Sequence, residues 1–353
     1  MGSVFGRYLR AATFGESHGK AVGVVLEGVP AGLCLDAALI QRDLDRRRPG
    51  QSAFTSPRRE SDQVEILSGL GADGRTLGTP LALLVKNQDA RSKDYGALSQ
   101  VFRPGHADYT YFHKYGVSPQ PGGGRASGRE TVGRVAAGAV ARALLAPLGV
   151  SIQAYTAQVG TVRAQARDLA FAEGDPLRCP DPALAEAMAQ EVRAASASGD
   201  SVGGVVEVLV RGVPAGLGDP VADKLDALLG GAMLGIGGVK GLEVGDGFAV
   251  ASRRGSANND QIDAKGFLTN HAGGILGGIS SGQDILLRLA VKPTPSIAQP
   301  QQTIDLQGRP ASIEIKGRHD PCLCPRIAPV AEAMAALVLA DAWLAQRAST
   351  ITG

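Results

Sequence analysis

One segment of this chain occurs twice, and the second copy begins 184 residues after the first. Residues 15–33 and 199–217 share eleven of nineteen positions, and both end in Gly-Val-Pro-Ala-Gly-Leu. Each copy indicates a tight turn, a strand rich in β-branched residues and then a Pro-Gly turn. A chance similarity between two turns would not keep one offset over a whole strand, so we expect one structural unit to occur twice.

Both copies lead into a predicted helix. Asp36 is a candidate N-cap for the first, and Asp219 followed by Pro220 is expected to cap and start the second. The apolar faces of these helices are predicted to be Leu35, Leu39, Ile40 and Leu44, and Val221, Leu225, Leu228 and Leu229. The shared residues are turn and core types, whereas His18 of the first copy corresponds to Val202 of the second. Only the first copy therefore carries an ionisable group at this position.

Two further apolar segments predict buried helices. Residues 130–148 carry small and apolar residues at helical spacing, at Val132, Val135, Ala136, Ala139, Val140, Ala143 and Leu144. Residues 330–345 are interrupted by Glu332 and Asp341 and fall short of the ~20 residues of a membrane span, so we expect a buried amphipathic helix. Because strand and helix rarely alternate, we predict an α+β fold in which helices pack against mainly antiparallel sheets.

The composition is that of a globular protein with no dominant charge. The 353 residues, 44% of them apolar, can bury a substantial core, and no low-complexity linker divides them. A net charge of +2 gives no argument for nucleic acid or a membrane as partner. Four cysteines without a C-x-x-C pair favour neither disulfides nor a metal site, and the N-terminus lacks the apolar run of a signal peptide. We therefore expect a cytoplasmic protein without a metal.

Three of the five histidines, His18, His106 and His319, lie in polar turns that contain glycine or proline. Histidine exchanges protons near neutral pH, and neighbouring arginines can stabilise an anionic substrate. A single loop histidine often bonds only backbone groups, but three in such surroundings indicate a binding surface. His113 and His271 are expected to be structural.

Arginines are the second group of candidates, because a guanidinium binds phosphate or carboxylate in bidentate geometry. Arg125 and Arg129 belong to a glycine-rich loop before the predicted central helix, whose N-terminus favours an anion. In the run of three arginines at 46–48, we expect the outer two, Arg46 and Arg48, to be solvated. The glycine loop is not a P-loop, since Arg129 and Glu130 stand where Lys and Ser or Thr are required. A Rossmann fingerprint is also missing, which disfavours a dehydrogenase.

A third group lies in residues 270–282, which are rich in glycine, and 292–297, which combine proline with Lys, Thr and Ser. Rigid prolines beside polar side chains can form a preshaped cradle for a phosphate tail, and glycines can lie flat against a planar ring. Composition alone does not distinguish such a cradle from two structural loops.

These motifs together resemble the chorismate synthase family over nearly the whole chain. The segments that carry the resemblance follow the family's order: GESHG, DRRRPG, RPGHADYTY, GGGRASGRET, VGDGF, NHAGGILGGISSG, KPTPSI and GRHDPC. The resemblance implies one domain over residues 1–353, a β-α-β sandwich with an internal pseudo-repeat, and a homotetramer. It implies the anti-1,4-elimination of phosphate from 5-enolpyruvylshikimate 3-phosphate to give chorismate, with reduced FMN as cofactor. Whether NADPH reduces the flavin on this protein stays open.

The resemblance also implies roles for individual residues. His106 matches the histidine that protonates or holds the leaving phosphate, His18 the one that protonates the reduced flavin, and Asp320 the carboxylate associated with the flavin N5 proton. Contacts to FMN are implied for Arg125, Ala126, Ser127, Gly237, Gly238, Gly278, Lys292, Pro293, Thr294, Pro295, Ser296 and Arg318. Contacts to substrate or NADP are implied for Arg47, Arg103 and Arg129.

The chain departs from the family's commonest pattern at three places. Ala126 replaces a frequent Ser, Gly237-Gly238 replaces a frequent Asn-Ala, and Ala53 stands where many relatives carry a basic residue. Two other functions stay open at this point. One is a flavin oxidoreductase that transfers hydride in the same cradle, and the other is a non-catalytic anion- or RNA-binding module, which the 4% aromatic content disfavours.

Overall fold

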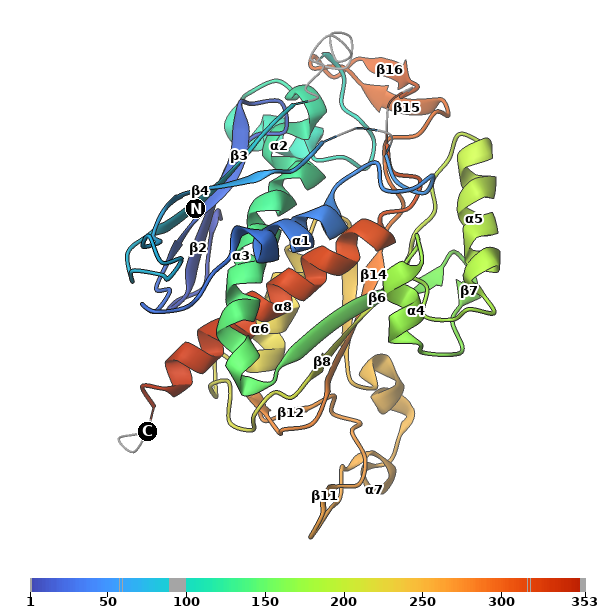
Figure 1. Ribbon diagram of the computed structural model, residues 1–353. Helices are drawn as coiled ribbons and strands as arrows, with labels where there is room; N and C mark the ends of the chain where they lie inside the picture. The colour runs from blue at the N-terminus through green and yellow to red at the C-terminus, as the bar shows by residue number, and fades with distance from the viewer. Residues whose placement is uncertain are drawn as a thin grey trace.

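The computed structural model describes residues 2–56, 58, 60–88, 100–315, 317 and 319–349. Two five-stranded sheets enclose a layer of helices (Figure 1). In spatial order, the first sheet consists of β1 (Val4–Phe5), β2 (Arg10–Gly15), β3 (Ala21–Glu27), β5 (Leu81–Lys86) and β4 (Val64–Ser68). The second consists of β7 (Val162–Arg163), β6 (Ser151–Val159), β8 (Gly204–Arg211), β14 (Ile285–Val291) and β9 (Val239–Val244). The strand pairs within both sheets are antiparallel.

The helix layer depends on small residues at its contacts. It consists of α1 (Ala37–Arg47), α3 (Thr131–Leu145), α6 (Leu225–Leu234) and α8 (Cys324–Gln346). Helix α3 packs on β3, α8 packs on β6 and β8, and α3 and α8 pack on each other. A Cβ added to Gly138 of α3 would lie 2.3 Å from the Cβ of Ala333 in α8. Glycine therefore permits the close approach of the two central helices.

The repeated segment occupies equivalent places in the two sheets. Strands β3 and β8 are each third in their sheet, and each is followed by a Gly-Val-Pro-Ala-Gly-Leu turn. Both glycines of that turn have positive φ in both copies, 81° and 88° at Gly28 and Gly32 and 74° and 104° at Gly212 and Gly216. By chain order and position, β2, α1, β4, β5 and α3 correspond to β6, α6, β9, β14 and α8. The predicted α+β fold with a pseudo-repeat is confirmed.

The helix that follows the first copy begins as predicted. Asp36 caps α1, because its carboxylate accepts a hydrogen bond from the Ala38 amide at 2.9 Å. Ile40 and Leu44 are buried, whereas Leu39 is exposed. The prediction for Leu39 is wrong because it precedes Ile40 by one residue and so points about 100° away around the helix.

The helix that follows the second copy begins later than predicted. Helix α6 starts at Leu225, and Val221, predicted to lie on its apolar face, is 84% exposed. The predicted cap at Asp219 and Pro220 is therefore wrong. The Leu225 amide donates to the carbonyl oxygen of Gly278 at 2.8 Å, and this backbone contact replaces a capping side chain.

The two central helices are core elements. The predicted face of α3 is buried except at the partly buried Ala143. Helix α8 starts at Cys324, before the predicted segment, and is buried on all sides rather than amphipathic, because it lies between α3 and the second sheet. The segments Gly128–Leu148 and Cys324–Gln346 are long and apolar enough to cross a membrane by length and composition, with 61% and 83% of their apolar windows buried inside the protein.

Glu332 in α8 explains why one predicted surface arginine is partly buried. The Glu332 carboxylate is 1% exposed and accepts hydrogen bonds from Arg46 at 2.5 Å, from Arg142, and from the Ala154 amide at 2.7 Å. The expectation that Arg46 is solvated is wrong, whereas Arg48 is half exposed. Although burial favours the neutral acid, the charges of Arg142 and Arg46 lower the pKa of Glu332 to about 2.

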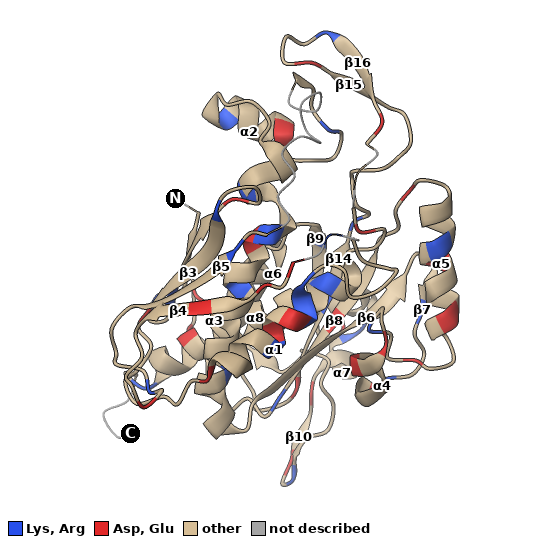
Figure 2. Ribbon diagram, turned by 45° about the horizontal axis from the view of Figure 1, so that its top comes forward, with Lys and Arg blue, Asp and Glu red and all other residues tan. Residues whose placement is uncertain are grey.

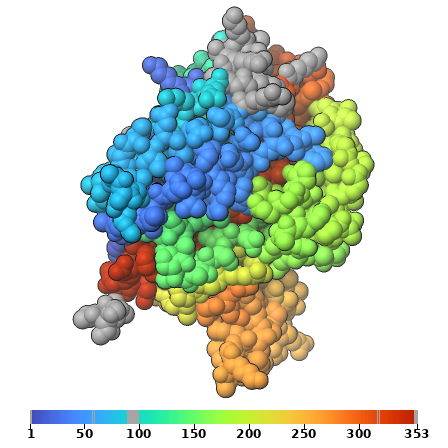
Figure 3. Space-filling view, in the orientation of Figure 1, coloured from blue at the N-terminus to red at the C-terminus, as the bar shows by residue number. Residues whose placement is uncertain are grey.

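Smaller elements surround this core. Helix α2 (Asp108–Tyr115) and the hairpin of β15 (Gln301–Ile304) and β16 (Pro310–Ile313) lie at one end, and α4 (Leu169–Gly174) and α5 (Ala185–Ala197) pack on β6 (Figure 1). Residues 245–282, between β9 and β14, form an arm that projects from the other end (Figures 1 and 3). The arm contains η6 (Gly247–Ser252), α7 (Gly255–Asn258), β10 (Ile262–Asp263), β11 (Gly266–Phe267), β12 (Ile275–Leu276) and β13 (Ile279–Ser280).

Candidate active site

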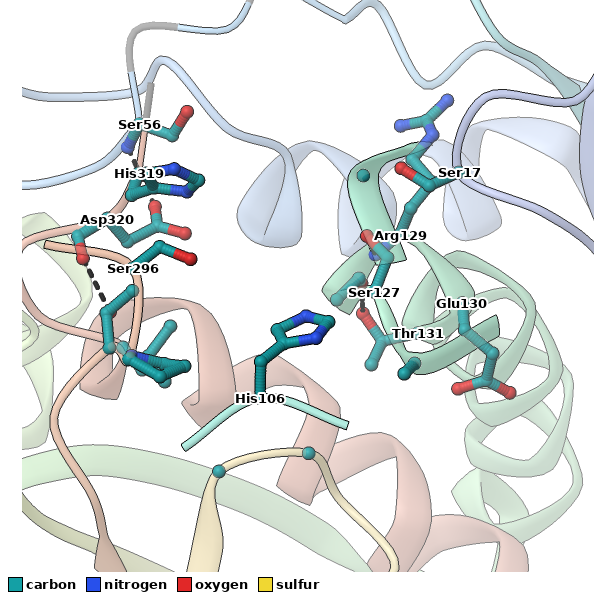
Figure 4. A pocket seen from close by; sticks show the side chains of 18 of the residues that line it. Ser17, Ser56, His106, Ser127, Arg129, Glu130, Thr131, Ser296, His319 and Asp320 are labelled. Carbon is teal, nitrogen blue, oxygen red and sulfur yellow. Dashed lines mark hydrogen bonds between the residues drawn. The ribbon is translucent and has the colours of Figure 1, made fainter. Parts of the chain in front are cut away.

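A cavity of about 870 Å³ brings together segments that are far apart in the sequence. Its walls come from the turn after β2, the segment before α2, the loop before α3, the end of α6, the loop after β14 and the start of α8. Figure 4 shows His319 and Asp320 on one side, Ser127 and Arg129 on the opposite side, and His106 between them. A concave site of this size is typical of small-molecule binding.

Most residues predicted for the site line this one cavity: His18, Arg47, Arg103, His106, Arg125, Ala126, Ser127, Arg129, Gly237, Gly238, Lys292, Thr294, Pro295, Ser296 and Asp320. Gly278 and Pro293 do not line it. Gly278 lies in the turn between β12 and β13, where its carbonyl oxygen contacts the start of α6. Arg318 lies outside the described residues.

The three glycines before α3 bring the chain against two imidazoles. They lie in η3 (Pro121–Ala126), and Gly122, Gly123 and Gly124 have φ values of 63°, 87° and 53°. A Cβ added to Gly122 would lie 2.5 Å from Cδ2 of His18, and one added to Gly123 would lie 2.8 Å from Cε1 of His106. Both the left-handed backbone and the close approach require glycine. The loop therefore fixes the spacing between the two imidazoles.

Asp108 binds two side chains of the cavity wall. Its carboxylate is 3% exposed and accepts hydrogen bonds from Nε and Nη2 of Arg103 at 2.6 and 2.7 Å. Nδ1 of His106 lies 2.8 Å from Oδ1 of Asp108 and 3.1 Å from Nη2 of Arg103. Burial opposes ionisation, but the hydrogen bonds from Arg103 and His106 hold the pKa of the Asp108 carboxyl well below its usual range. Asp108 is therefore an anion within the wall.

A second buried carboxylate, Asp62, pairs with Arg47 and Arg129, one through each oxygen. Asp62 has a φ of 48°, which is uncommon outside glycine but tolerated by Asp. Burial alone would raise its pKa, but the two guanidiniums outweigh burial and lower it to about 2. Burial, together with the charges of Arg326 and Arg129, lowers the pKa of Arg47 to about 10 despite Asp62. Cations thus outnumber anions around Arg47.

The opposite wall is held by Asp320. One oxygen accepts from the Ser56 amide at 2.7 Å and the other from Nη1 of Arg326 at 2.6 Å, while the Asp320 carbonyl accepts from the Thr294 hydroxyl at 2.6 Å (Figure 4). His319 beside it has its pKa lowered to about 4, first by burial and then by the charges of Arg103 and His106. His319 is therefore a neutral imidazole at pH 7 and contributes no positive charge for binding an anion.

The cavity combines a basic lining with an apolar patch. Basic side chains surround it, namely Arg47, Arg58, Arg103, Arg125, Arg129, Arg134, Lys292 and Arg326. Figure 2 shows basic positions gathered around α1 and beside β5. The apolar patch consists of Ile236, Leu323, Ile327 and Val330. Within the described parts of the chain, no group of three or more His, Cys, Asp or Glu side chains is arranged to hold a metal ion.

Four residues of this arrangement escaped the sequence analysis. Asp108 lies two residues after His106, and this spacing was its only signal. Ser17 lies in the GESHG segment, but its partner Arg58 is 41 residues away, and Asp62 and Arg326 contact Arg47 from 15 and 279 residues away in the chain. Ser17 and Arg326 line the cavity, whereas Asp62 and Asp108 do not line it but pair with arginines that do.

A helix layer between two sheets, with imidazoles and guanidiniums converging on one concave site, defines an enzyme for an anionic small molecule. Comparison with known proteins is more specific. The family model for chorismate synthase matches residues 9–344. The chain belongs to the chorismate synthase family, a family of carbon-oxygen lyases in the shikimate pathway.

The similarity extends over whole chains. Chorismate synthase of Porphyromonas gingivalis is 54% identical, with 98% of this chain and 96% of the relative covered. Those of Chloroflexus aurantiacus and Nitratidesulfovibrio vulgaris are both 55% identical, with 98% or more of each chain covered. A crystal structure of chorismate synthase that is 32% identical superimposes with a TM-score of 0.74 and covers 98% of this chain and 93% of that chain.

Proposed function

We propose that this chain catalyses the anti-1,4-elimination of phosphate from 5-enolpyruvylshikimate 3-phosphate to give chorismate. The observation that carries the proposal is the convergence of His18, His106 and Asp320 on one cavity lined by basic side chains. The substrate carries a phosphate and two carboxylates, and guanidiniums bind both groups in bidentate geometry. Arg47, Arg103 and Arg129 are therefore assigned to the substrate anions.

The residues present fit reduced FMN. The apolar patch of Ile236, Leu323, Ile327 and Val330 suits the face of a planar ring, and a Cβ added to Gly237 would meet nothing within 4 Å. Arg125, Ser127, Lys292 and the 294–296 segment supply cations and hydrogen-bonding groups for the ribityl phosphate. When bound, the reduced flavin supplies electron density that assists departure of the phosphate. Ala126 contributes no hydroxyl, so Ser127 supplies the hydroxyl of residues 125–127.

Three residues exchange or hold protons in this proposal. His106 protonates the leaving phosphate, or otherwise keeps the phosphate bound in a less basic form, because imidazole exchanges protons near neutral pH. His18 exchanges a proton with the flavin. Asp320 can take up a proton while these contacts stay in place, because each of its oxygens accepts one hydrogen bond, from Ser56 or from Arg326, and keeps a second lone pair.

The proposal includes one domain, a homotetramer and a cytoplasmic location. One hydrophobic core contains residues of both sheets and of the helix layer, which supports a single domain. The free thiols of Cys34, Cys179, Cys322 and Cys324 are consistent with a reducing compartment. Gel filtration of the purified chain tests the tetramer, and oxidation of NADPH by the flavin-loaded protein tests whether it reduces its own flavin.

An anaerobic assay with dithionite-reduced FMN and 5-enolpyruvylshikimate 3-phosphate tests the reaction. Phosphate and chorismate should appear in equal amounts while the flavin stays reduced. Oxidised flavin accumulating with each turnover would instead indicate an oxidoreductase. Nucleic-acid binding that weakens steeply with salt, without any FMN binding, would indicate the binding module.

A further inference from the structure

The buried carboxylate of Asp108 dictates which nitrogen of His106 carries the proton. Asp108 is held ionised, and a carboxylate oxygen only accepts hydrogen bonds. A lone pair on Nδ1 of His106, 2.8 Å from Oδ1, would face this anion and be repelled. Nη2 of Arg103 also approaches Nδ1, but at 3.1 Å this contact is longer than the 2.8 Å contact between Nδ1 and the carboxylate. The geometry therefore requires a proton on Nδ1.

The other nitrogen, Nε2, lies on the side of the ring that packs against Gly123. A Cβ at Gly123 would approach Nε2 to 3.0 Å, so only the glycine backbone leaves room there. His106 lines the cavity whereas Asp108 does not. Asp108 therefore acts on the reaction through another residue and has no contact with the substrate of its own.

We propose that Asp108 is the positioning residue of this site, which holds a proton on Nδ1 of His106 so that Nε2 is the nitrogen that gains and gives up a proton in the cavity. The inference rests on the proposed role of His106 in the elimination. The same carboxylate fixes Arg103, so one buried anion sets the distance between the proton-exchanging group and a guanidinium assigned to the substrate.

The structural alternative is that Asp108 only favours the start of α2, as the acidic residue of its first turn. The two possibilities differ in the Asp108→Asn variant. An amide is polar and similar in shape, but its nitrogen is a donor and cannot accept from Arg103 or His106. Only the positioning role predicts a changed tautomer of His106.

The first measurement is ¹⁵N NMR of histidine-labelled protein, with the His106 signals assigned from a His106→Gln variant. In its neutral form, His106 of the wild-type protein should show a protonated Nδ1 and a pyridine-like Nε2. Asp108→Asn should shift the ring toward the other tautomer, and Asp108→Glu, which keeps an accepting carboxylate, should retain the wild-type pattern. Asp181→Asn is the matched control, because Asp181 is equally buried and accepts from the backbone amides of Gln165, Ala166 and Ala183, away from the cavity.

The second measurement is a double-mutant cycle on turnover. Asp108→Asn should lower kcat about 10- to 100-fold in the wild-type background and cause little further loss of kcat in the His106→Gln background. An unchanged His106 tautomer in Asp108→Asn, or an equal loss of kcat in both backgrounds, overturns the proposal. The NMR measurement needs neither substrate nor flavin, so it remains decisive if the proposed reaction fails. If Asp108→Asn does not fold, a tautomer change in Asp108→Glu alone contradicts the inference.

Discussion

The guanidinium of Arg47 and the carboxylate of Asp62 form an ion pair with side chains that are only 1% and 0% exposed to solvent. The second oxygen of Asp62 pairs with Arg129, whose Nε donates to Asn87 at 2.7 Å. Two arginines assigned to the substrate thus share one carboxylate, and their positions depend on it.

Removing the charge of Asp62 tests this dependence. Asp62→Asn keeps the shape of the residue and tolerates the left-handed backbone, but leaves two buried guanidiniums with weaker partners. We expect the free energy of unfolding at pH 7 to fall by about 3–5 kcal/mol in urea titrations. A loss below about 1 kcal/mol would mean that other groups, such as Glu60, suffice to neutralise the arginines.

Glu332 predicts a pH dependence of stability. Its pKa is lowered from 4.5 to about 2 in the folded protein, so the unfolded chain binds the proton more tightly. The contribution to stability is complete above pH 4.5 and is lost as the pH falls toward 2, a change of about 3 kcal/mol. Urea unfolding between pH 7 and pH 3 should show a smaller decline in Glu332→Gln than in the wild-type protein. Equal declines in the two proteins would contradict the assignment.

Gly122 offers a test of the contact between the glycine loop and His18. Gly122→Ala places a Cβ 2.5 Å from the imidazole and should lower turnover strongly. Gly116→Ala is the matched control, because Gly116 has a similar φ of 67° but open space around the added Cβ. The control should lose about 1 kcal/mol of stability and keep its activity. Equal activities of the two variants would show that the imidazole tolerates displacement.

His106→Ala should separate turnover from cofactor binding. Because His106 is assigned to the leaving phosphate, turnover should fall strongly while the FMN dissociation constant stays within about a few-fold. Steady-state kinetics and a fluorescence titration of FMN measure the two quantities. Wild-type turnover in this variant would remove His106 from the mechanism.

Ser127→Ala and Lys292→Ala should show the opposite pattern. Both residues line the cavity and are assigned to the flavin, so FMN affinity should fall before turnover at saturating FMN does. Asp181→Asn, whose side chain binds only backbone amides away from the cavity, controls for general destabilisation. FMN titrations that are unchanged in both cavity variants would argue against the proposed cradle.

The repeated unit could be predicted from the sequence because turns and strands are determined by residues that are close together in the chain. The start of α6 was not readable, since the backbone of Gly278 stabilises that helix end from 53 residues away in the chain. Most residues assigned by motif converge on the cavity, whereas the carboxylates that hold the arginines were missed. Asp62 and Glu332 look like ordinary surface acids in the sequence, and only the packing of distant segments buries them.

The two copies of the repeated unit contribute to the cavity in different ways. The turn of the first copy carries His18, whose ring packs on Gly122. In the second copy the equivalent position is Val202, whose amide donates to the Pro321 carbonyl at 2.9 Å, and the preceding Ser201 hydroxyl donates to the Thr294 carbonyl at 2.7 Å. One half of the molecule thus presents a reactive side chain, and the other half uses the same turn as a brace for the facing wall. Two structurally equivalent turns thus serve different purposes, because they carry different residues at one position.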